Sequence, residues 1–245
     1  MNGLDLFSGI GGLTSALLPW VRPIAYCEND RYAQAVLLSR MADCSLPAAP
    51  IWHDVRTLRW DRDLPTIDII YGGFPCQDIS CAGNGAGLAG ERSGLFFEIE
   101  RLVSELEPSF VFLENVSAIR TRGADVVAGR LANLGYDCRW QTLSAADVGA
   151  PHRRKRWWLL AYSMRTRLQK SWREESKAED LWRRSAAQRR VQDPFWLPTT
   201  GELRRVADGL SPATHRVKAL GNAVVPQCAR EAFMRLSGIS SLYDY

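Results

Sequence analysis

A cysteine that follows two glycines and a proline is the residue of this chain best suited to chemistry. The apolar run 67–71 predicts a strand that ends at Gly72-Gly73, and Phe74-Pro75-Cys76-Gln77 then leads into a glycine-rich loop. Open α/β folds bind their ligands at the carboxyl edge of the sheet, where such a strand would deliver its loop. A free cysteine is most often a small buried hydrophobe. Its setting here predicts instead that Cys76 is an exposed nucleophile.

A carboxylate and two arginines could assist that nucleophile. Glu114 follows the apolar stretch 110–113, which predicts a buried strand of a parallel sheet. Partial burial there would raise the pKa of Glu114 and suit it to donate a proton. Arg154 and Arg156 alternate along an extended segment, so their guanidinium groups could bind phosphate or fix a carboxylate. A surface carboxylate and a merely basic loop remain the alternatives.

Three further strand ends indicate an adenosine-containing cofactor. The turn Ser8-Gly9-Ile10-Gly11-Gly12 lets the backbone approach a ligand closely, but it lacks the G-x-G-x-x-G spacing of a dinucleotide site. Glu28 ends the second predicted strand, where it could bind ribose hydroxyls, and Asp54 follows the third, where it could accept from an adenine amino group. A tight structural turn, a helix N-terminal charge and a turn-forming aspartate are the respective alternatives.

Alternating strands and helices must position these residues. Strands are predicted at 3–7, 24–27, 51–53, 67–71, 110–113, 136–143 and 157–161, and helices at 30–40, 95–106, 127–134 and from Pro226 onward. In the first of these helices, Tyr32, Ala35, Val36 and Ser39 share a face, and Asp30 is its expected N-cap. The pattern predicts a parallel sheet with helices, interrupted from Ser163 to about Arg205 by an irregular segment.

Composition and charge limit the class of protein. The 245 residues are 46% hydrophobic and 24% charged, as expected for one core with a small insertion. We expect a cytoplasmic protein with no membrane partner, because the chain has neither an apolar stretch of membrane-spanning length nor a secretion signal. The six cysteines have no zinc-binding spacing, so we expect free thiols and no metal.

The basic residues are concentrated in one segment. Residues 153–190 hold thirteen Lys/Arg against four Asp/Glu, whereas the whole chain has a net charge of only +4. A mildly acidic body with one basic segment favours a polyanionic partner bound at that place. A solvated surface insertion is the alternative.

Taken in order, the motifs resemble one family, the cytosine-5 DNA methyltransferases. The matching blocks are Asp5 to Gly12, Glu28, Asp54, Gly73-Phe74-Pro75-Cys76-Gln77, Ser93 to Phe97, Glu114-Asn115-Val116, Gly149 to Arg156 and Gly221 to Pro226. They cover about 1–162 and 215–236. Several blocks are weak singly, but their shared order is specific.

The resemblance implies a fold and a division of the chain. The fold would be α/β, a Rossmann-like sheet of S-adenosylmethionine-dependent methyltransferases with a small, irregular target-recognition region. Residues 1–162 would form the catalytic and cofactor-binding domain, 163–210 the basic target-recognition region, and 211–245 a segment that returns to the catalytic domain. A compact bacterial or phage-type enzyme is the expectation.

The resemblance also implies roles for single residues. Cys76 would attack carbon 6 of a cytosine flipped out of double-stranded DNA, and Glu114 would bond ring nitrogen 3. Arg156 would support Glu114 and the base, and Arg154 the loop or a phosphate. Phe7 would pack on the adenine of S-adenosyl-L-methionine. The implied cofactor-binding set is Phe7, Ser8, Gly9, Gly11, Gly12, Glu28, Asn29, Asp54, Val55, Gly73, Pro75, Asn222, Ala223 and Val224.

The chain also departs from the family pattern. His152 stands where the family commonly has glutamine, and the usual block before the final helix is not recognisable. We expect a monomer, and a cognate restriction endonuclease is possible but not indicated. Methylation of transfer RNA and a catalytically silent DNA-binding relative remain alternatives, although a silent relative would be expected to lack the nucleophile or the acid.

Overall fold

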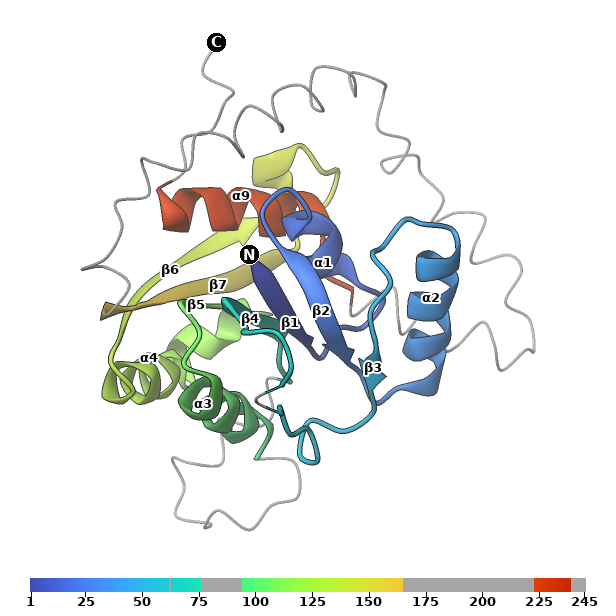
Figure 1. The fold of residues 1–245 in the computed structure, drawn as a ribbon. Coiled ribbons are helices and arrows are strands. Elements are labelled where there is room, and N and C mark those ends of the chain that lie inside the picture. The colour runs from blue at the N-terminus through green and yellow to red at the C-terminus, as the bar shows by residue number, and fades with distance from the viewer. Residues whose placement is uncertain (62, 76–93, 165–222, 239–245) are drawn as a thin grey trace.

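A computed structural model describes residues 1–61, 63–75, 94–164 and 223–238 of the chain (Figure 1). These residues form a seven-stranded sheet in the order β3-β2-β1-β4-β5-β7-β6. The strands are β1 (Asn2–Leu6), β2 (Arg22–Cys27), β3 (Ile51–Trp52), β4 (Ile69–Gly73), β5 (Phe110–Val116), β6 (Tyr136–Ser144) and β7 (Lys155–Ser163). The strands from β3 to β5 are parallel, whereas β7 is antiparallel to both of its neighbours. The expected parallel sheet is therefore a mixed one.

Helices cover both faces of this sheet, as Figure 1 shows. The helices are α1 (Gly12–Leu17), α2 (Arg31–Ala42), α3 (Leu95–Leu106), α4 (Ala124–Asn133) and α9 (Pro226–Ser237), with 3-10 turns η3 (Ser117–Thr121) and η4 (Ala145–Val148). Buried side chains of α3 and α4 share one apolar cluster with one face of the strands, and those of α1 and α9 share another with the opposite face. The result is three layers, helix–sheet–helix.

Aromatic side chains fill the core between the sheet and α9. Phe112 of β5 stacks on Trp158 of β7, with ring centroids 5.6 Å apart. Phe233 of α9 meets Phe112 edge-on at 5.3 Å and lies 5.4 Å from Trp20. Adjacent Trp157 faces the other cluster, as the alternation of side chains along a strand requires. Strand β7 is therefore buried on both faces.

Strand β4 begins and ends two residues later than the predicted run 67–71. The sequence predicts a strand that ends at Gly72-Gly73, and these two glycines are the last residues of β4, where they pair with Leu113 and Glu114 of β5. A β-carbon on Gly72 would stand 2.3 Å from the carbonyl oxygen of Leu6 in β1. The glycine thus permits β4 to pack closely against β1 at the end of the strand.

Helix α2 begins as predicted but turns a different face inward. The Asp30 side chain accepts hydrogen bonds from the backbone N–H groups of Tyr32 and Ala33, which makes it the N-cap. The buried residues are Ala33 and Leu37, not the face that the sequence indicates.

In the part of the chain that the structure describes, no helix has the length and hydropathy to cross a membrane.

Replacing Gly72 by alanine tests the close approach of β4 to β1. We expect Gly72→Ala to lower the free energy of unfolding by about 1–3 kcal/mol, because the new methyl group meets a backbone atom that cannot move aside alone. Urea unfolding measures the change. Gly129→Ala is the control, since open space surrounds that glycine of α4; it should gain about 0.5–1 kcal/mol from better helix propensity. Equal effects of the two substitutions would contradict the packing described.

Candidate active site

Those of the predicted site residues that the structure describes lie at one edge of the sheet. Strands β1, β2, β3, β4 and β5 are parallel, so their carboxyl ends lie together. The glycine turn follows β1, Glu28 follows β2, Asp54 comes shortly after β3, and Glu114 lies near the end of β5. Sequence spacing alone separates these residues by tens of positions, and the parallel topology brings them to a common edge.

The turn after β1 has an unusual backbone. Phe7 adopts a φ of 54°, which is rare for a residue other than glycine, and Gly9 and Gly11 follow at 55° and 82°. The turn is closed by a 2.8 Å hydrogen bond from the Gly11 N–H to the Ser8 carbonyl. Among the described residues, no atom beyond Gly9 and its two chain neighbours lies within 4 Å of the position that a Gly9 β-carbon would take. The turn therefore leaves open space beside its backbone, as a ligand-binding loop requires.

Glu28 is fixed beside this turn by backbone donors. One carboxylate oxygen accepts from the Gly9 N–H at 2.7 Å, and the other accepts from the Asp30 N–H at 2.8 Å. The residue is only 9% exposed. Each oxygen keeps a second lone pair, so an oriented carboxylate faces the site and can accept from hydroxyl groups of a ligand.

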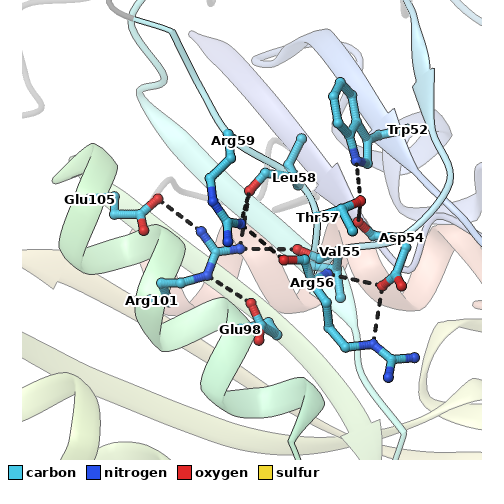
Figure 2. Close-up of polar contacts among 10 residues, drawn as sticks. All are labelled: Trp52, Asp54, Val55, Arg56, Thr57, Leu58, Arg59, Glu98, Arg101 and Glu105. Carbon is cyan, nitrogen blue, oxygen red and sulfur yellow. Dashed lines mark hydrogen bonds and ion pairs between the residues drawn. The ribbon is translucent and has the colours of Figure 1, made fainter.

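Asp54 is held in a compact turn after β3, which Figure 2 shows in close-up. One of its carboxylate oxygens accepts from the backbone N–H of Arg56 at 3.0 Å and from the Arg56 guanidinium at 3.2 Å. The backbone bond is the main reason that the pKa of Asp54 lies below its ordinary value. Asp54 therefore presents an ionised acceptor near the edge, and the neighbouring Val55 is buried.

The final helix reaches the glycine turn from the opposite end of the chain. A β-carbon on Gly12 would stand 3.0 Å from the carbonyl oxygen of Val224. Val224, just before α9, therefore lies against the start of α1. The contact places the described part of the predicted block Gly221 to Pro226 beside the turn that is predicted to bind the cofactor.

Glu114 occupies a space that a glycine leaves open. Gly73 of β4 pairs with Glu114 of β5 in the parallel register. A β-carbon on Gly73 would stand 3.0 Å from one carboxylate oxygen of Glu114, closer than a side chain is normally accommodated. Gly73 thus leaves room for the carboxylate beside it.

Two arginines of the segment before and within β7 act on Glu114. The Arg156 Nε lies 2.7 Å from a Glu114 oxygen, in a pair whose side chains are only 21% and 11% exposed. The antiparallel register places Arg156 opposite Val116, at the end of β5 where Glu114 lies. Arg154 adds a second positive charge that favours the ionised carboxylate.

Burial nevertheless prevails over these charges. Removal of Glu114 from water raises its pKa to about 7, although the charges of Arg156 and Arg154 oppose the rise. An ion pair alone would lower the pKa. Near neutral pH the Glu114 carboxyl can therefore hold or release a proton, which is the property of a general acid.

Asn115 is a supporting residue that sequence reasoning did not single out. It is 2% exposed, and its side-chain amide donates to the Phe74 carbonyl at 2.9 Å. Its side-chain oxygen accepts from the Val116 N–H at 2.8 Å. Asn115 thus ties β5 to the residue just before Pro75 and Cys76. The Glu-Asn pair at the strand end was the available signal.

A buried polar network below the glycine turn was also missed. The Thr14 hydroxyl lies 2.6 Å from an Asp5 carboxylate oxygen and 2.8 Å from the Tyr71 hydroxyl, so three elements are linked. Asp5 is fully buried, and this burial raises its pKa to about 8. The network connects β1, α1 and β4 beneath the site.

Some predicted residues lie outside the described part of the chain. These are Cys76, Asn222 and, from residue 165 onward, the basic segment 163–205. Among the described ones, Asn29 and Pro75 are exposed at the edge of the sheet, and Phe7 is partly buried. The ligand roles assigned to all of them stay predictions.

The titration of Glu114 tests the electrostatics of the site. We expect its carboxyl carbon to titrate near pH 7 in a ¹³C NMR experiment, with the protonated form dominant below that pH. Arg156→Ala should raise the pKa further, because its positive charge and hydrogen bond favour the ionised form. Arg130→Ala should leave the titration unchanged, since Arg130 pairs with Glu100. A Glu114 that titrates near 4.5, or a pKa lowered by Arg156→Ala, would contradict this account.

Comparison with known proteins gives the family. Residues 1–219 match the model of the C-5 cytosine-specific DNA methylases. Type II methyltransferase M.CviJI of Paramecium bursaria Chlorella virus IL3A is 38% identical over 160 residues, which are 64% of this chain and 42% of the relative. Type II methyltransferase M.HhaI of Haemophilus parahaemolyticus is 33% identical over 164 residues, 65% of this chain and 48% of the relative.

Solved structures agree on the fold. A protein described as a DNA modification methyltransferase, encoded within a prophage of E. coli, superposes with a TM-score of 0.57 at 28% identity, covering 70% of this chain and 49% of that one. Dnmt2 methyltransferase of S. pombe, at 24% identity, gives a TM-score of 0.54 over 66% of this chain and 51% of that one.

The chain thus spans about half the length, or less, of the relatives it matches. Its fold is the α/β fold of S-adenosylmethionine-dependent methyltransferases, as predicted. By the extent of the model match, the chain belongs to the C-5 cytosine-specific DNA methylase family.

Proposed function

We propose that the protein transfers a methyl group from S-adenosyl-L-methionine to carbon 5 of cytosine in double-stranded DNA. The observation that carries the proposal is the buried Glu114 carboxyl, paired with Arg156 and facing Gly73, three residues before Cys76. A proton donor with a pKa of about 7 next to a cysteine-bearing loop suits acid-assisted attack on a heteroaromatic ring. Family membership supports the choice of cytosine and DNA.

The residues at the edge of the sheet fit the cofactor. The oriented Glu28 carboxylate would accept from ribose hydroxyls, Asp54 from the adenine amino group, and the Ser8 to Gly12 turn would lie along the open space beside Gly9. The remaining members of the proposed set are Phe7, Asn29, Val55, Gly73, Pro75, Asn222, Ala223 and Val224. When bound, S-adenosyl-L-methionine would supply an electrophilic methyl group.

The nucleophilic step would use the Cys76 thiolate. Its sulfur would form a bond to carbon 6 of a cytosine extruded from the duplex, since the stacked base hides that ring edge. The electrons of the carbon 5–carbon 6 double bond would move into the ring toward nitrogen 3, which takes the proton of Glu114. The resulting Glu114 carboxylate would be stabilised by Arg156 at 2.7 Å and by the charge of Arg154.

The later steps restore the ring and the protein. Carbon 5, now electron-rich, would gain the methyl group as its bond to the donor sulfur breaks and S-adenosylhomocysteine is left, and would then lose its hydrogen as a proton to solvent. The bond from sulfur to carbon 6 would then break, which returns the thiolate of Cys76. Nitrogen 3 would give its proton back to Glu114. Each residue of the chain ends in the state in which it began.

The same proposal divides the chain. Residues 1–162 would hold cofactor and catalysis, 163–210 would bind the DNA target through its arginines, and 211–245 would return to the catalytic domain. We propose a cytoplasmic monomer that acts alone or beside a restriction endonuclease. The basic segment supports DNA as the polyanion, because phosphate contacts supply most of the affinity of such proteins.

Methyl transfer to nucleic acid tests the proposal. Purified protein with labelled S-adenosyl-L-methionine should label duplex DNA of mixed sequence, with the label released as 5-methylcytosine, and should not label transfer RNA. Cys76→Ser should abolish transfer. Glu114→Gln should reduce the rate by about 10²–10⁴-fold, the usual contribution of a positioned acid.

Glu231→Gln is the matched control. Glu231 also pairs with an arginine, at 2.6 Å, but on the exposed side of α9. The methyl-transfer rate of Glu231→Gln should stay within twofold of the rate of the unmodified protein. Labelling of transfer RNA but not of DNA would show that transfer RNA is the substrate instead. Full activity of Cys76→Ser would show that Cys76 has no part in the mechanism. No transfer to either nucleic acid would overturn the enzymatic proposal.

A further inference from the structure

Helix α3 carries an arginine that holds the turn after β3. One terminal nitrogen of Arg101 donates to the carbonyl oxygens of Val55 and Leu58, at 3.0 and 3.1 Å. The two partners lie more than forty positions away in the chain. Figure 2 shows the guanidinium reaching from α3 to this turn. The contact joins two segments that no strand pairing connects.

The guanidinium is held in that direction by its own helix. Arg101 Nε lies 2.7 Å from Glu98, one turn before it, and its other terminal nitrogen lies 2.9 Å from Glu105, one turn after it. Two carboxylates at helical spacing thus fix the planar fork, and the nitrogen that remains faces the turn. The Arg101 side chain is only 24% exposed, so water competes weakly for these bonds.

The turn that Arg101 holds is the one that presents Asp54. The Thr57 N–H and hydroxyl both donate to the Asp54 carbonyl at 3.0 Å, and the Trp52 indole N–H donates to the Thr57 hydroxyl at 3.0 Å. The Val55 and Leu58 side chains are buried in the core. The turn is therefore a compact unit. Arg101 holds its Val55 and Leu58 carbonyls from α3, and the Leu58 carbonyl also accepts from Arg59 at 2.9 Å.

We propose that Arg101 is a positioning residue for recognition of the cofactor's adenine. By holding the carbonyls of Val55 and Leu58, it sets the turn so that the Asp54 carboxylate meets the adenine amino group. The inference rests on the proposed function, in which Asp54 binds adenine. It means that adenine binding by Asp54 depends on a residue of α3. This helix is the first described one after the segment that carries Cys76.

Paired ligands that differ at the adenine amino group test this role. S-adenosylhomocysteine carries that group, whereas S-inosylhomocysteine has a carbonyl oxygen there, which would face the Asp54 carboxylate unfavourably. Calorimetry should show that the unmodified protein prefers the adenosyl ligand. Arg101→Ala should bind S-adenosylhomocysteine about tenfold more weakly, as expected from two lost charge-assisted bonds, and its preference between the two ligands should fall at least threefold.

Two variants separate this role from general support of the fold. Arg130→Ala removes an arginine that pairs with Glu100 of α3 at 3.4 Å but does not contact the turn; it should keep both affinities. Arg101→Lys should recover part of the preference, because an ammonium can reach one carbonyl but lacks the planar fork. With S-adenosyl-L-methionine as substrate, Arg101→Ala should raise KM with little change in kcat.

Hydrogen exchange in the absence of ligand tests, independently of the proposed function, whether Arg101 holds the turn. The N–H groups of Thr57 and Leu58, which donate within the turn, should exchange faster in Arg101→Ala and not in Arg130→Ala. Unchanged exchange, or an undiminished preference for the adenosyl ligand in Arg101→Ala, would overturn the inference while methyl transfer stands. Failure of the unmodified protein to bind S-adenosylhomocysteine would overturn the cofactor assignment, and the adenine role with it.

Discussion

The parallel pairing of β4 with β5 is the constraint on which the site depends. It sets Gly73 opposite Glu114, so the space that a side chain would fill on one strand holds the carboxylate of the next. Asn115 adds a second tie by donating to the Phe74 carbonyl. The direction in which the chain leaves toward Cys76 and the position of the acid are therefore fixed by the same pair of strands.

Electrostatics at this edge follow from burial. The Glu114 carboxyl is withdrawn from water more strongly than the neighbouring guanidinium groups compensate, so its pKa rises to about 7 and both its protonated and ionised forms are populated near neutral pH. At the other end of the edge, Glu28 and Asp54 take backbone N–H bonds and keep lone pairs for a ligand. One sheet edge thus offers a proton donor at β5 and hydrogen-bond acceptors at β2 and β3, which matches a ring substrate beside an adenosine-containing cofactor.

Sequence reasoning predicted the order of elements and the carboxylates at strand ends, because hydrophobic runs and the residues that follow them are local signals. Sequence reasoning did not show the features that depend on contacts between residues far apart in the chain. Gly72 and Gly73 do end β4, as the sequence indicates, but the local pattern does not show that Leu6 of β1 and Glu114 approach them closely. Asn115 and Arg101 resemble ordinary polar residues of a strand end and a helix surface, and only their distant backbone partners reveal a role. The parts assigned to Cys76, Asn222 and 163–205 stay predictions.

The central claim is that Cys76 attacks a cytosine whose nitrogen 3 receives a proton from Glu114. Fluorine at carbon 5 cannot leave as a cation, so a methylated 5-fluorocytosine should stay bonded to its nucleophile. Mass spectrometry of the protein after reaction with S-adenosyl-L-methionine and a random-sequence duplex pool containing 5-fluorocytosine measures this directly. The account predicts a covalent adduct of protein, DNA strand and methyl group, mapped to Cys76 and formed far more slowly in Glu114→Gln. An adduct on another residue, or methylation of ordinary DNA without any adduct on the fluorinated pool, would contradict it.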